Sequence, residues 1–407
     1  MPPGWTLQRQ GAGVGSAGPE GPTFRGCSAV SEAVCWVSGS GGTVIRTDNG
    51  GATWEDVSPP GLGELEFRDV HAFSADSAFI LSVGNGGSSR IMRTRDGGQR
   101  WDTVFVNEEE EAFYNFLGFF DGGQRGIAFS DTVGGCFRII TTQDFGESWS
   151  VVPQQSLPAA LEGEGAFAAS GKNMALRSGG LAWIGMGAAA RARVLRSDDF
   201  GLSWQVAETP LDSGPSAGIF SLAALDDVTA VAVGGDYQTE DEAVRNVAVT
   251  DDGGVTWQLA PEPEGFRSVA AFVETERGPL LLALGPSGAD LSTDCGKSWL
   301  PSPTPVRGLH IQPSPRRGLW LGGRGWRSGG AARAGGGAAG RGRRGPAVTR
   351  AALGQAAASR ARRGQPYRPR PPRSGARIFP RLRKPTIESC SQRPSPSIQP
   401  SRARALS

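Results

Sequence analysis

Histidine, cysteine and carboxylate side chains are the groups of this sequence that could do chemistry, and their spacing restricts that chemistry. The two histidines, His71 and His310, lie far apart in the sequence, which argues against a histidine-centred triad or a His-rich metal site. The five cysteines are scattered without CxxC spacing, so they indicate neither a zinc site nor a dense disulfide framework. Cys27 and Cys35 could pair across adjacent strands, but buried free thiols are favoured. Because Asp and Glu are plentiful, hydrolysis by two carboxylates stays open.

Many of the acidic residues fall in an eight-residue repeat, S/T-x-[D/N]-x-G-x-x-W, which we call the box. Its six copies are TDNGGATW, TRDGGQRW, TQDFGESW, SDDFGLSW, TDDGGVTW and STDCGKSW, at residues 47–54, 94–101, 142–149, 197–204, 250–257 and 292–299. Asp-rich loops can bind calcium, but single carboxylates on separate turns do not make a cage of roughly six to eight oxygens. We therefore expect no metal, and a structural role for Asn49, Trp54, Asp96, Trp101, Asp144, Trp149, Asp199, Trp204, Asp252, Trp257, Asp294 and Trp299.

The residue types of the box suit a hairpin turn. A short hydroxyl side chain and an Asp can accept hydrogen bonds from backbone N–H groups that a turn leaves unpaired. Glycine at the fifth position adopts a positive φ at little cost. The closing Trp then begins an outer strand and can bury its ring between neighbouring sheets.

The spacing of the boxes predicts the fold. Successive box tryptophans are 42 to 55 residues apart, which is typical of four-stranded propeller blades. Residues 308–322 repeat the two inner strands without a box, and the N-terminal GWTLQ segment (4–8), with Trp5, could supply an outer strand to close the ring. We therefore predict an all-β protein, a β-propeller of about seven four-stranded blades with Asp-box turns, followed by a disordered C-terminal tail.

The charge of the sequence divides the chain at about residue 323. Residues 324–407 contain 20 Arg or Lys and one Glu, a net charge of +19, which leaves residues 1–323 at −17. The Arg/Gly/Pro-rich segment has too little apolar surface for a core. We expect residues 1–323 to form the propeller, with the N-terminal strand closing its last blade, and 324–407 to be a disordered basic tail, or the product of a disrupted reading frame. The acidic propeller gives no reason to expect specific nucleic-acid binding.

Loops between the second and third strands of the blades vary in sequence, and function is usually found on such loops of a regular scaffold. They should lie on the rim opposite the boxes. The longest is the acidic insertion at Tyr237–Glu242. A further acidic residue, Glu164, lies between glycines and supports little by itself. The candidate binding rim, with solvated turn residues as the equally weighted alternative, comprises Asn85, Arg90, Asp131, Arg191, Arg193, Asp236, Tyr237 and Asn246.

At the boxes, the chain resembles the Asp-box (BNR-like) propellers, a group that includes sialidases. It is most similar to the photosystem II stability and assembly factor family and its bacterial relatives, in motifs such as WVSGSGGTVIRTDNGGATW over about residues 24–323. The resemblance implies a protein partner, in that family a photosystem-type membrane protein. Family members carry signal sequences into the thylakoid lumen or periplasm, and the N-terminus here shows no basic segment followed by an apolar run.

We therefore expect a non-catalytic, monomeric interaction scaffold that needs no cofactor. The alternatives are a sialidase-like exo-glycoside hydrolase and a non-catalytic carbohydrate or small-ligand binder. A sialidase would need a Tyr nucleophile and three arginines that grip the substrate carboxylate. The aromatic-Arg-Ile-Pro motif of sialidases is absent, and the nearest segment, Phe137–Ile140, ends in Ile.

Overall fold

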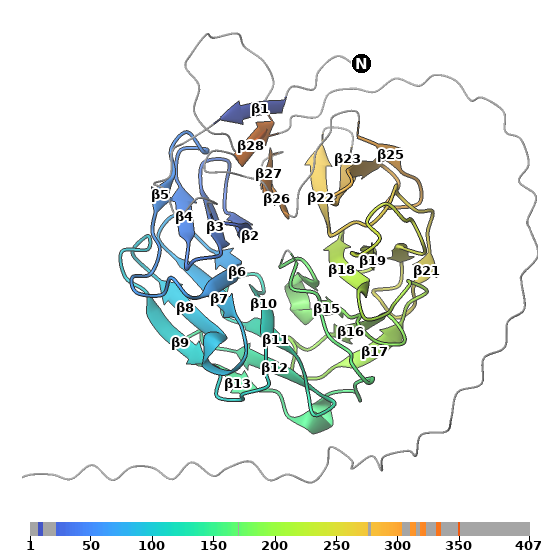
Figure 1. Ribbon diagram of the computed structural model, residues 1–407, viewed down its shortest axis with the longest axis horizontal. Coiled ribbons are helices and arrows are strands. Elements are labelled where there is room, and N and C mark those ends of the chain that lie inside the picture. Colours follow the sequence, from blue (N-terminus) through green and yellow to red (C-terminus); the bar gives the residue numbers. More distant parts are fainter. Residues whose placement is uncertain are drawn as a thin grey trace, which may run out of the picture.

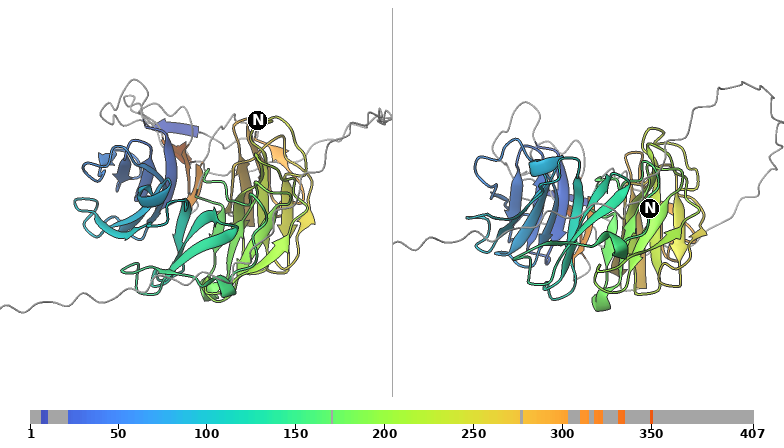
Figure 2. Two further views of the ribbon diagram at one scale, coloured as in Figure 1. Left: turned by 60° about the horizontal axis from the view of Figure 1, so that its bottom comes forward. Right: turned by 90° about the horizontal axis from the view of Figure 1, so that it is seen from below.

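The computed structural model describes residues 7–10, 22–169, 171–275, 278–302, 310–314, 318–322, 331–334 and 349–350. Six antiparallel sheets of four strands each surround a common axis as the blades of a propeller (Figure 1). Seen from the side, the blades form a disc whose strands run across its thickness (Figure 2). In every blade the chain passes from the innermost strand to the outermost in sequence order.

The strands of the six blades are short, and four of the outer strands have two residues. Blades 1 to 3 consist of β2 Phe24–Ala29, β3 Cys35–Gly39, β4 Val44–Thr47 and β5 Glu55–Asp56; β6 Glu66–Ala72, β7 Ala78–Val83, β8 Arg90–Thr94 and β9 Asp102–Val106; β10 Tyr114–Phe119, β11 Gly126–Val133, β12 Cys136–Thr142 and β13 Ser150–Val151. Blades 4 to 6 consist of β14 Met174–Leu176, β15 Ala182–Gly185, β16 Arg193–Ser197 and β17 Gln205–Glu208; β18 Ala217–Ala224, β19 Ala230–Asp236, β20 Val247–Thr250 and β21 Gln258–Leu259; β22 Val269–Thr275, β23 Gly278–Leu284, β24 Ala289–Ser292 and β25 Leu300–Pro301. The 3-10 turns are η1 Gly86–Ser88, η2 Gln154–Ser156 and η3 Ser178–Gly180.

The predicted number of about seven four-stranded blades is wrong, because the residues that the structure describes form six. A further sheet contains β26 His310–Ser314, β27 Gly318–Gly322, β28 Ala331–Ala334 and β1 Leu7–Gln10, with β29 Thr349–Arg350 beside β28. It therefore has five strands, one of them parallel to its neighbour. The physical reason is that no box follows β27, so no hairpin turn directs the chain into an outer strand of the same sheet.

The N-terminal strand of the structure pairs antiparallel with β28. The predicted strand at 4–8 overlaps it in part, and Trp5 lies outside the described residues. Beyond β28 and β29, residues 324–407 also lie outside them, so the predicted disorder of the tail stays a prediction.

The box turns have the hydrogen bonds that their residue types suggest. In all six copies the first hydroxyl accepts a bond of 2.8–3.0 Å from the N–H of the fifth-position glycine. The third-position Asp or Asn accepts one of 2.8–3.0 Å from the seventh residue. Although burial acts in the opposite direction, hydrogen bonds from Thr256 and Thr250 lower the pKa of Asp252 to about 2. These carboxylates are thus bound to their own turns.

The box tryptophans pack where neighbouring blades meet. Trp101 of blade 2 contacts the apolar cluster shared with blade 1, and its Nε1 donates to the Val57 carbonyl oxygen at 2.8 Å. Trp204 and Trp257 pack in the same way against blades 3 and 4. The core is therefore a series of layers between blades, and the box tryptophans of blades 2 to 6 join each blade to the preceding one.

Candidate binding face

The connections between second and third strands lie on the face opposite the box turns, because the two connections leave opposite ends of the third strand. We call this side of the disc the loop face. The connections between successive blades open onto it as well. All eight predicted rim residues lie at this end of blades 2 to 5, namely Asn85, Arg90, Asp131, Arg191, Arg193, Asp236, Tyr237 and Asn246.

Three of the predicted residues belong to turns. Arg90 and Asp236 bond to the backbone of their own turns, and Asn85 lies at the edge of one. Arg90 donates from Nε to the Gly87 carbonyl oxygen at 2.5 Å. The Asp236 carboxylate accepts a bond of 2.8 Å from the Gln238 N–H. Asn85 is exposed before η1, and its side chain makes no capping hydrogen bond. These side chains are those of ordinary turns.

Arg191 and Asn246 also have local partners. Arg191 forms an exposed ion pair with Glu208 on the outer strand of the same blade. Asn246 is fully buried and donates from Nδ2 to the Gly265 carbonyl oxygen at 2.7 Å. The buried amide therefore fixes the connection between blades 5 and 6 and is not available to a partner.

Arg193 belongs to a buried ion pair that the sequence did not indicate. Its Nε donates to Glu164 Oε1 at 2.7 Å, and the two side chains are 8% and 0% exposed. The Leu161 N–H bonds the same carboxylate at 2.8 Å. Glu164, which seemed a lone carboxylate between glycines, thus anchors the long connection between blades 3 and 4.

This connection brings residues 163–169 across the centre of the loop face, and we call them the crossing segment. The Ala166 N–H donates to Asp131 Oδ1 of blade 3 at 3.0 Å, and Asn115 donates to the same oxygen at 2.7 Å. The Ala168 carbonyl oxygen accepts a bond of 3.3 Å from the Arg68 guanidinium of blade 2. The crossing segment therefore links blade 3, which precedes it in the chain, to blade 2, which is not its neighbour in sequence.

Aromatic rings surround the middle of the crossing segment. Phe167 stacks on Phe220 with ring centroids 4.0 Å apart and an interplanar angle of 7°. Tyr237 meets both rings edge-on at 6.2 Å, and Phe266 meets Phe220 at 4.7 Å. Tyr237 is 45% exposed. Of the eight predicted residues, Asp131, Arg193 and Tyr237 are thus the three that contact the crossing segment: Asp131 bonds its backbone, Arg193 pairs with Glu164, and Tyr237 lies against Phe167.

Sequence reasoning missed the residues at the start of the inner strands. The pairing of the first two strands shifts register at equivalent points of blades 1, 2, 3 and 5. The extra residues at these β-bulges are Arg25, Arg68, Asn115 and Phe220. Two of them, Arg68 and Phe220, contact the crossing segment. A recurring sequence pattern at the start of the inner strands could have indicated these positions. It appears as FRGCSAV, FRDVHAF and FRSVAAF, at residues 24–30, 67–73 and 266–272.

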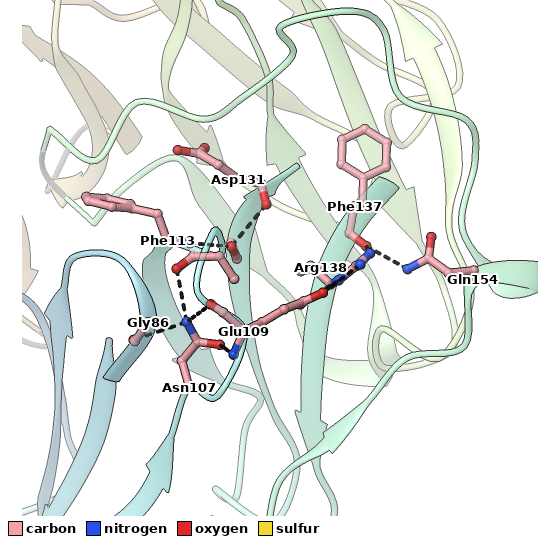
Figure 3. Close-up of polar contacts among 10 residues, drawn as sticks. Gly86, Asn107, Glu109, Phe113, Asp131, Phe137, Arg138 and Gln154 are labelled. Atoms are coloured by element: carbon pink, nitrogen blue, oxygen red, sulfur yellow. Dashed lines mark hydrogen bonds and ion pairs between the residues drawn. The ribbon is translucent and has the colours of Figure 1, made fainter. Parts of the chain in front are cut away.

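The connection between blades 2 and 3 is held rigidly beside Asp131 (Figure 3). Asn107 donates from Nδ2 to the Gly86 and Ala112 carbonyl oxygens at 3.1 and 3.0 Å. The Glu109 carboxylate accepts three bonds from the Arg138 guanidinium, the shortest being 2.7 Å. This part of the loop face is therefore held by its own hydrogen bonds and ion pair.

Asp69 is a buried carboxylate on the inner strand of blade 2. Its Oδ2 accepts a bond of 2.9 Å from the Leu117 N–H of blade 3, and its Oδ1 accepts one of 2.9 Å from the Val70 N–H. Burial raises the pKa of Asp69 to about 7, although these hydrogen bonds and Lys172 act in the opposite direction. The Asp69 side chain thus connects blades 2 and 3, and burial makes its ionised form unfavourable.

The Asp69→Asn variant is expected to lose a pH dependence of stability. The pKa of Asp69 is about 7 in the folded protein and about 4 in the unfolded chain, so between these values the folded state binds more protons. The free energy of unfolding of the wild type therefore falls as pH rises from about 4 to about 7. Asparagine keeps one acceptor, so at pH 4 the variant should be about 1 kcal/mol less stable. Urea unfolding at several pH values measures both effects. Parallel stability curves for the two proteins would contradict the assignment.

The described part of the chain contains no group of three or more His, Cys, Asp or Glu side chains that could hold a metal ion. Cys27 and Cys35 are free and buried, with Sγ atoms 3.7 Å apart. No helix among the described residues has the length and apolar character needed to cross a bilayer.

No protein-family model and no curated protein matches the sequence. Among solved structures, the chain is similar to YCF48 from Cyanidioschyzon merolae, with 16% identity, a TM-score of 0.52 and coverage of 78% of this chain and 95% of that one. It is also similar to the WD40 repeats of RRP9, with 12% identity, a TM-score of 0.52 and coverage of 79% and 96%. The WD40 propeller domain of Doa1 matches with 12% identity, a TM-score of 0.50 and coverage of 78% and 94%. At these identities the likeness shows the fold, and the predicted β-propeller is confirmed.

Proposed function

We propose that this protein is a non-catalytic scaffold that holds a protein partner on the loop face of its propeller. The observation that carries the proposal is the position of Tyr237, which is 45% exposed and stands edge-on to the Phe167–Phe220 stack. A tyrosine exposed over an aromatic floor offers a large contact area with little conformational freedom to lose. Ordered loops around it supply polar groups for a rim.

The arginines of the chain support the scaffold over a sialidase-like hydrolase. Gripping a substrate carboxylate requires guanidinium groups that are free to bind it. Arg138, Arg193 and Arg267 each form an ion pair with a carboxylate of this chain instead. Tyr114 is buried, and burial raises the pKa of its phenol well above the usual range, which makes it a poor nucleophile.

Affinity capture with matched variants tests the scaffold. Tyr237→Ala is expected to reduce capture of the partner by about tenfold, as for loss of one central aromatic contact. Val255→Ala provides the control, because Val255 is 61% exposed in a box turn on the opposite face. Capture should be done at high salt, since the basic residues 324–407 attract polyanions without specificity. Equal loss, or no loss, with the two variants would refute the loop face as the binding site.

A screen with fluorogenic glycosides tests the hydrolase alternative. The scaffold predicts no turnover. Hydrolysis that is abolished by Asp131→Ala or Tyr237→Phe would overturn it in favour of a glycosidase. Sugar binding without turnover, lost in Tyr237→Ala, would instead favour the carbohydrate binder, since an exposed aromatic ring also suits a sugar face.

The resemblance of the boxes to the photosystem II assembly factors extends the proposal to the identity of the partner. On that basis the partner is a membrane protein of the photosystem type. Mass spectrometry of the Tyr237-dependent fraction would identify it, and a partner of another class would remove this extension while leaving the scaffold in place.

A further inference from the structure

The crossing segment is bound in the manner of a short peptide ligand that turns after its aromatic residue, where the Ala169 N–H donates to the Phe167 carbonyl oxygen at 2.7 Å. One of its backbone N–H groups, that of Ala166, bonds the Asp131 carboxylate at 3.0 Å. One of its carbonyl groups, that of Ala168, accepts a bond of 3.3 Å from the Arg68 guanidinium. Between these two contacts the Phe167 side chain enters an aromatic site. Backbone contacts that flank a side-chain pocket are a recurring way in which proteins recognise extended peptides.

The pocket that receives Phe167 is built from two glycines and an aromatic ring. A Cβ atom at Gly187 would lie 2.8 Å from Phe167 Cε2, and one at Gly218 would lie 3.2 Å from the same atom. Phe220 stacks on the ring at 4.0 Å, and Tyr237 lies edge-on at 6.2 Å. The bare backbone on one side and the ring on the other leave a flat slot that selects an aromatic side chain.

We propose that Asp131, Arg68 and this pocket form a peptide-recognition site, and that the crossing segment occupies it as an internal competitor. The partner then presents a short segment with a small residue, an aromatic residue and a small residue, as in Ala166, Phe167 and Ala168, and turns directly after the aromatic residue as this chain does. Small flanking residues are required because the backbone must approach the carboxylate and the guanidinium closely. This inference rests on the proposed scaffold and names the chemistry of its partner.

An intramolecular segment competes at a high effective concentration, on the order of millimolar. An external peptide therefore binds the intact chain weakly, and binds better when Phe167 no longer fills the pocket. Glu164 holds the crossing segment from one end through its ion pair with Arg193. This ion pair should keep the connection folded in the Phe167→Ala variant, whose crossing segment lacks the ring contacts and is therefore displaced from Asp131 and Arg68 more easily by an external peptide.

Titration with a blocked pentapeptide, Gly-Ala-Phe-Ala-Ala, followed by saturation-transfer NMR of the phenyl protons, tests the proposal. The full-length Phe167→Ala variant is expected to bind the peptide about tenfold more tightly than the wild type. The control peptide, Gly-Ala-Ala-Ala-Ala, should not compete for it. The double variant Phe167→Ala/Phe220→Ala, which lacks the stacking partner, should lose the gain. Equal affinity for wild type and Phe167→Ala, or binding that persists in the double variant, would overturn the site.

A second measurement uses the wild-type chain and does not depend on the folding of a variant. Saturating pentapeptide is expected to increase hydrogen exchange at the Ala166 amide several-fold, because the displaced segment loses its bond to Asp131. Unchanged exchange at saturation would also overturn the site. If Tyr237-dependent capture of a partner succeeds while the peptide results fail, the scaffold stands and the recognition site is refuted. If capture fails as well, the loop face itself is refuted.

Discussion

Replacement of Trp183 by alanine is expected to lower the free energy of unfolding by about 3–5 kcal/mol. Trp183 is fully buried in the apolar cluster between blades 4 and 5. Its Nε1 donates to the Gly253 carbonyl oxygen in the box turn of blade 5 at 2.9 Å. Truncation would leave a large cavity and remove this hydrogen bond, although the Gly253 carbonyl oxygen keeps a second bond of 2.8 Å from Arg196 Nε. Urea unfolding of the full chain measures the loss.

The conservative variant Trp183→Phe separates the two contributions. Phenylalanine keeps most of the ring volume and loses the hydrogen bond, so the expected loss is about 1–2 kcal/mol. Trp54→Phe is a matched control, because Trp54 is only partly buried in a small cluster of blade 1. A loss for Trp183→Ala below that of Trp54→Phe would show that blades 4 and 5 are not joined through this residue.

Replacement of Glu164 by glutamine is expected to cost about 3–5 kcal/mol, because it leaves the Arg193 guanidinium buried without its counter-charge. The two side chains are 0% and 8% exposed. Hydrogen exchange of the crossing segment should show whether the loss is local or global. The same technique applied to wild type supplies the reference.

An exposed ion pair of the same blade provides the control for this prediction. Glu208→Gln removes the partner of Arg191, and both side chains of that pair are about 60% exposed. Its expected cost is below about 1 kcal/mol, because solvent screens the interaction. The double variant Glu164→Leu/Arg193→Met should recover most of the loss of Glu164→Gln. Equal effects of Glu164→Gln and Glu208→Gln would contradict the buried ion pair.

The box turns show how much of the backbone conformation the local sequence predicts. Glycine at the fifth box position was predicted to adopt a positive φ, and all six copies do so, at 74° to 90°. The fourth position also has a positive φ, from 59° to 76°, although Phe145, Phe200 and Cys295 stand there in three copies. Residue type alone did not indicate this, because the turn's hydrogen bonds impose the conformation on whichever side chain is present.

The count of blades was wrong, because it depended on a repeat without a box and on strands that come from both ends of the chain. Pairing between such distant segments leaves no local pattern in either of them.

The candidate rim was located by loop position, since hairpin topology alone determines which connections share a face. The position of a residue in a loop does not show whether its side chain pairs with a neighbouring residue or remains exposed. Arg193 lies beside Glu164, 29 residues earlier in the chain, and that contact removes it from the set. Arg68 and Phe220 lie at β-bulges of inner strands, not in loops, so loop position could not indicate them.

The sequence by itself determined the repeating turn, the blade and the face to which the second-to-third-strand loops belong, because each depends on hydrogen bonds and side-chain alternation within about fifty residues. Only the tertiary structure decided that residues 163–169 cross the centre of that face. Arg68 and Ala168 are 100 residues apart in the chain, and Phe167 and Phe220 belong to different blades. Such contacts form only when the ring of blades brings its inner strands together around one axis.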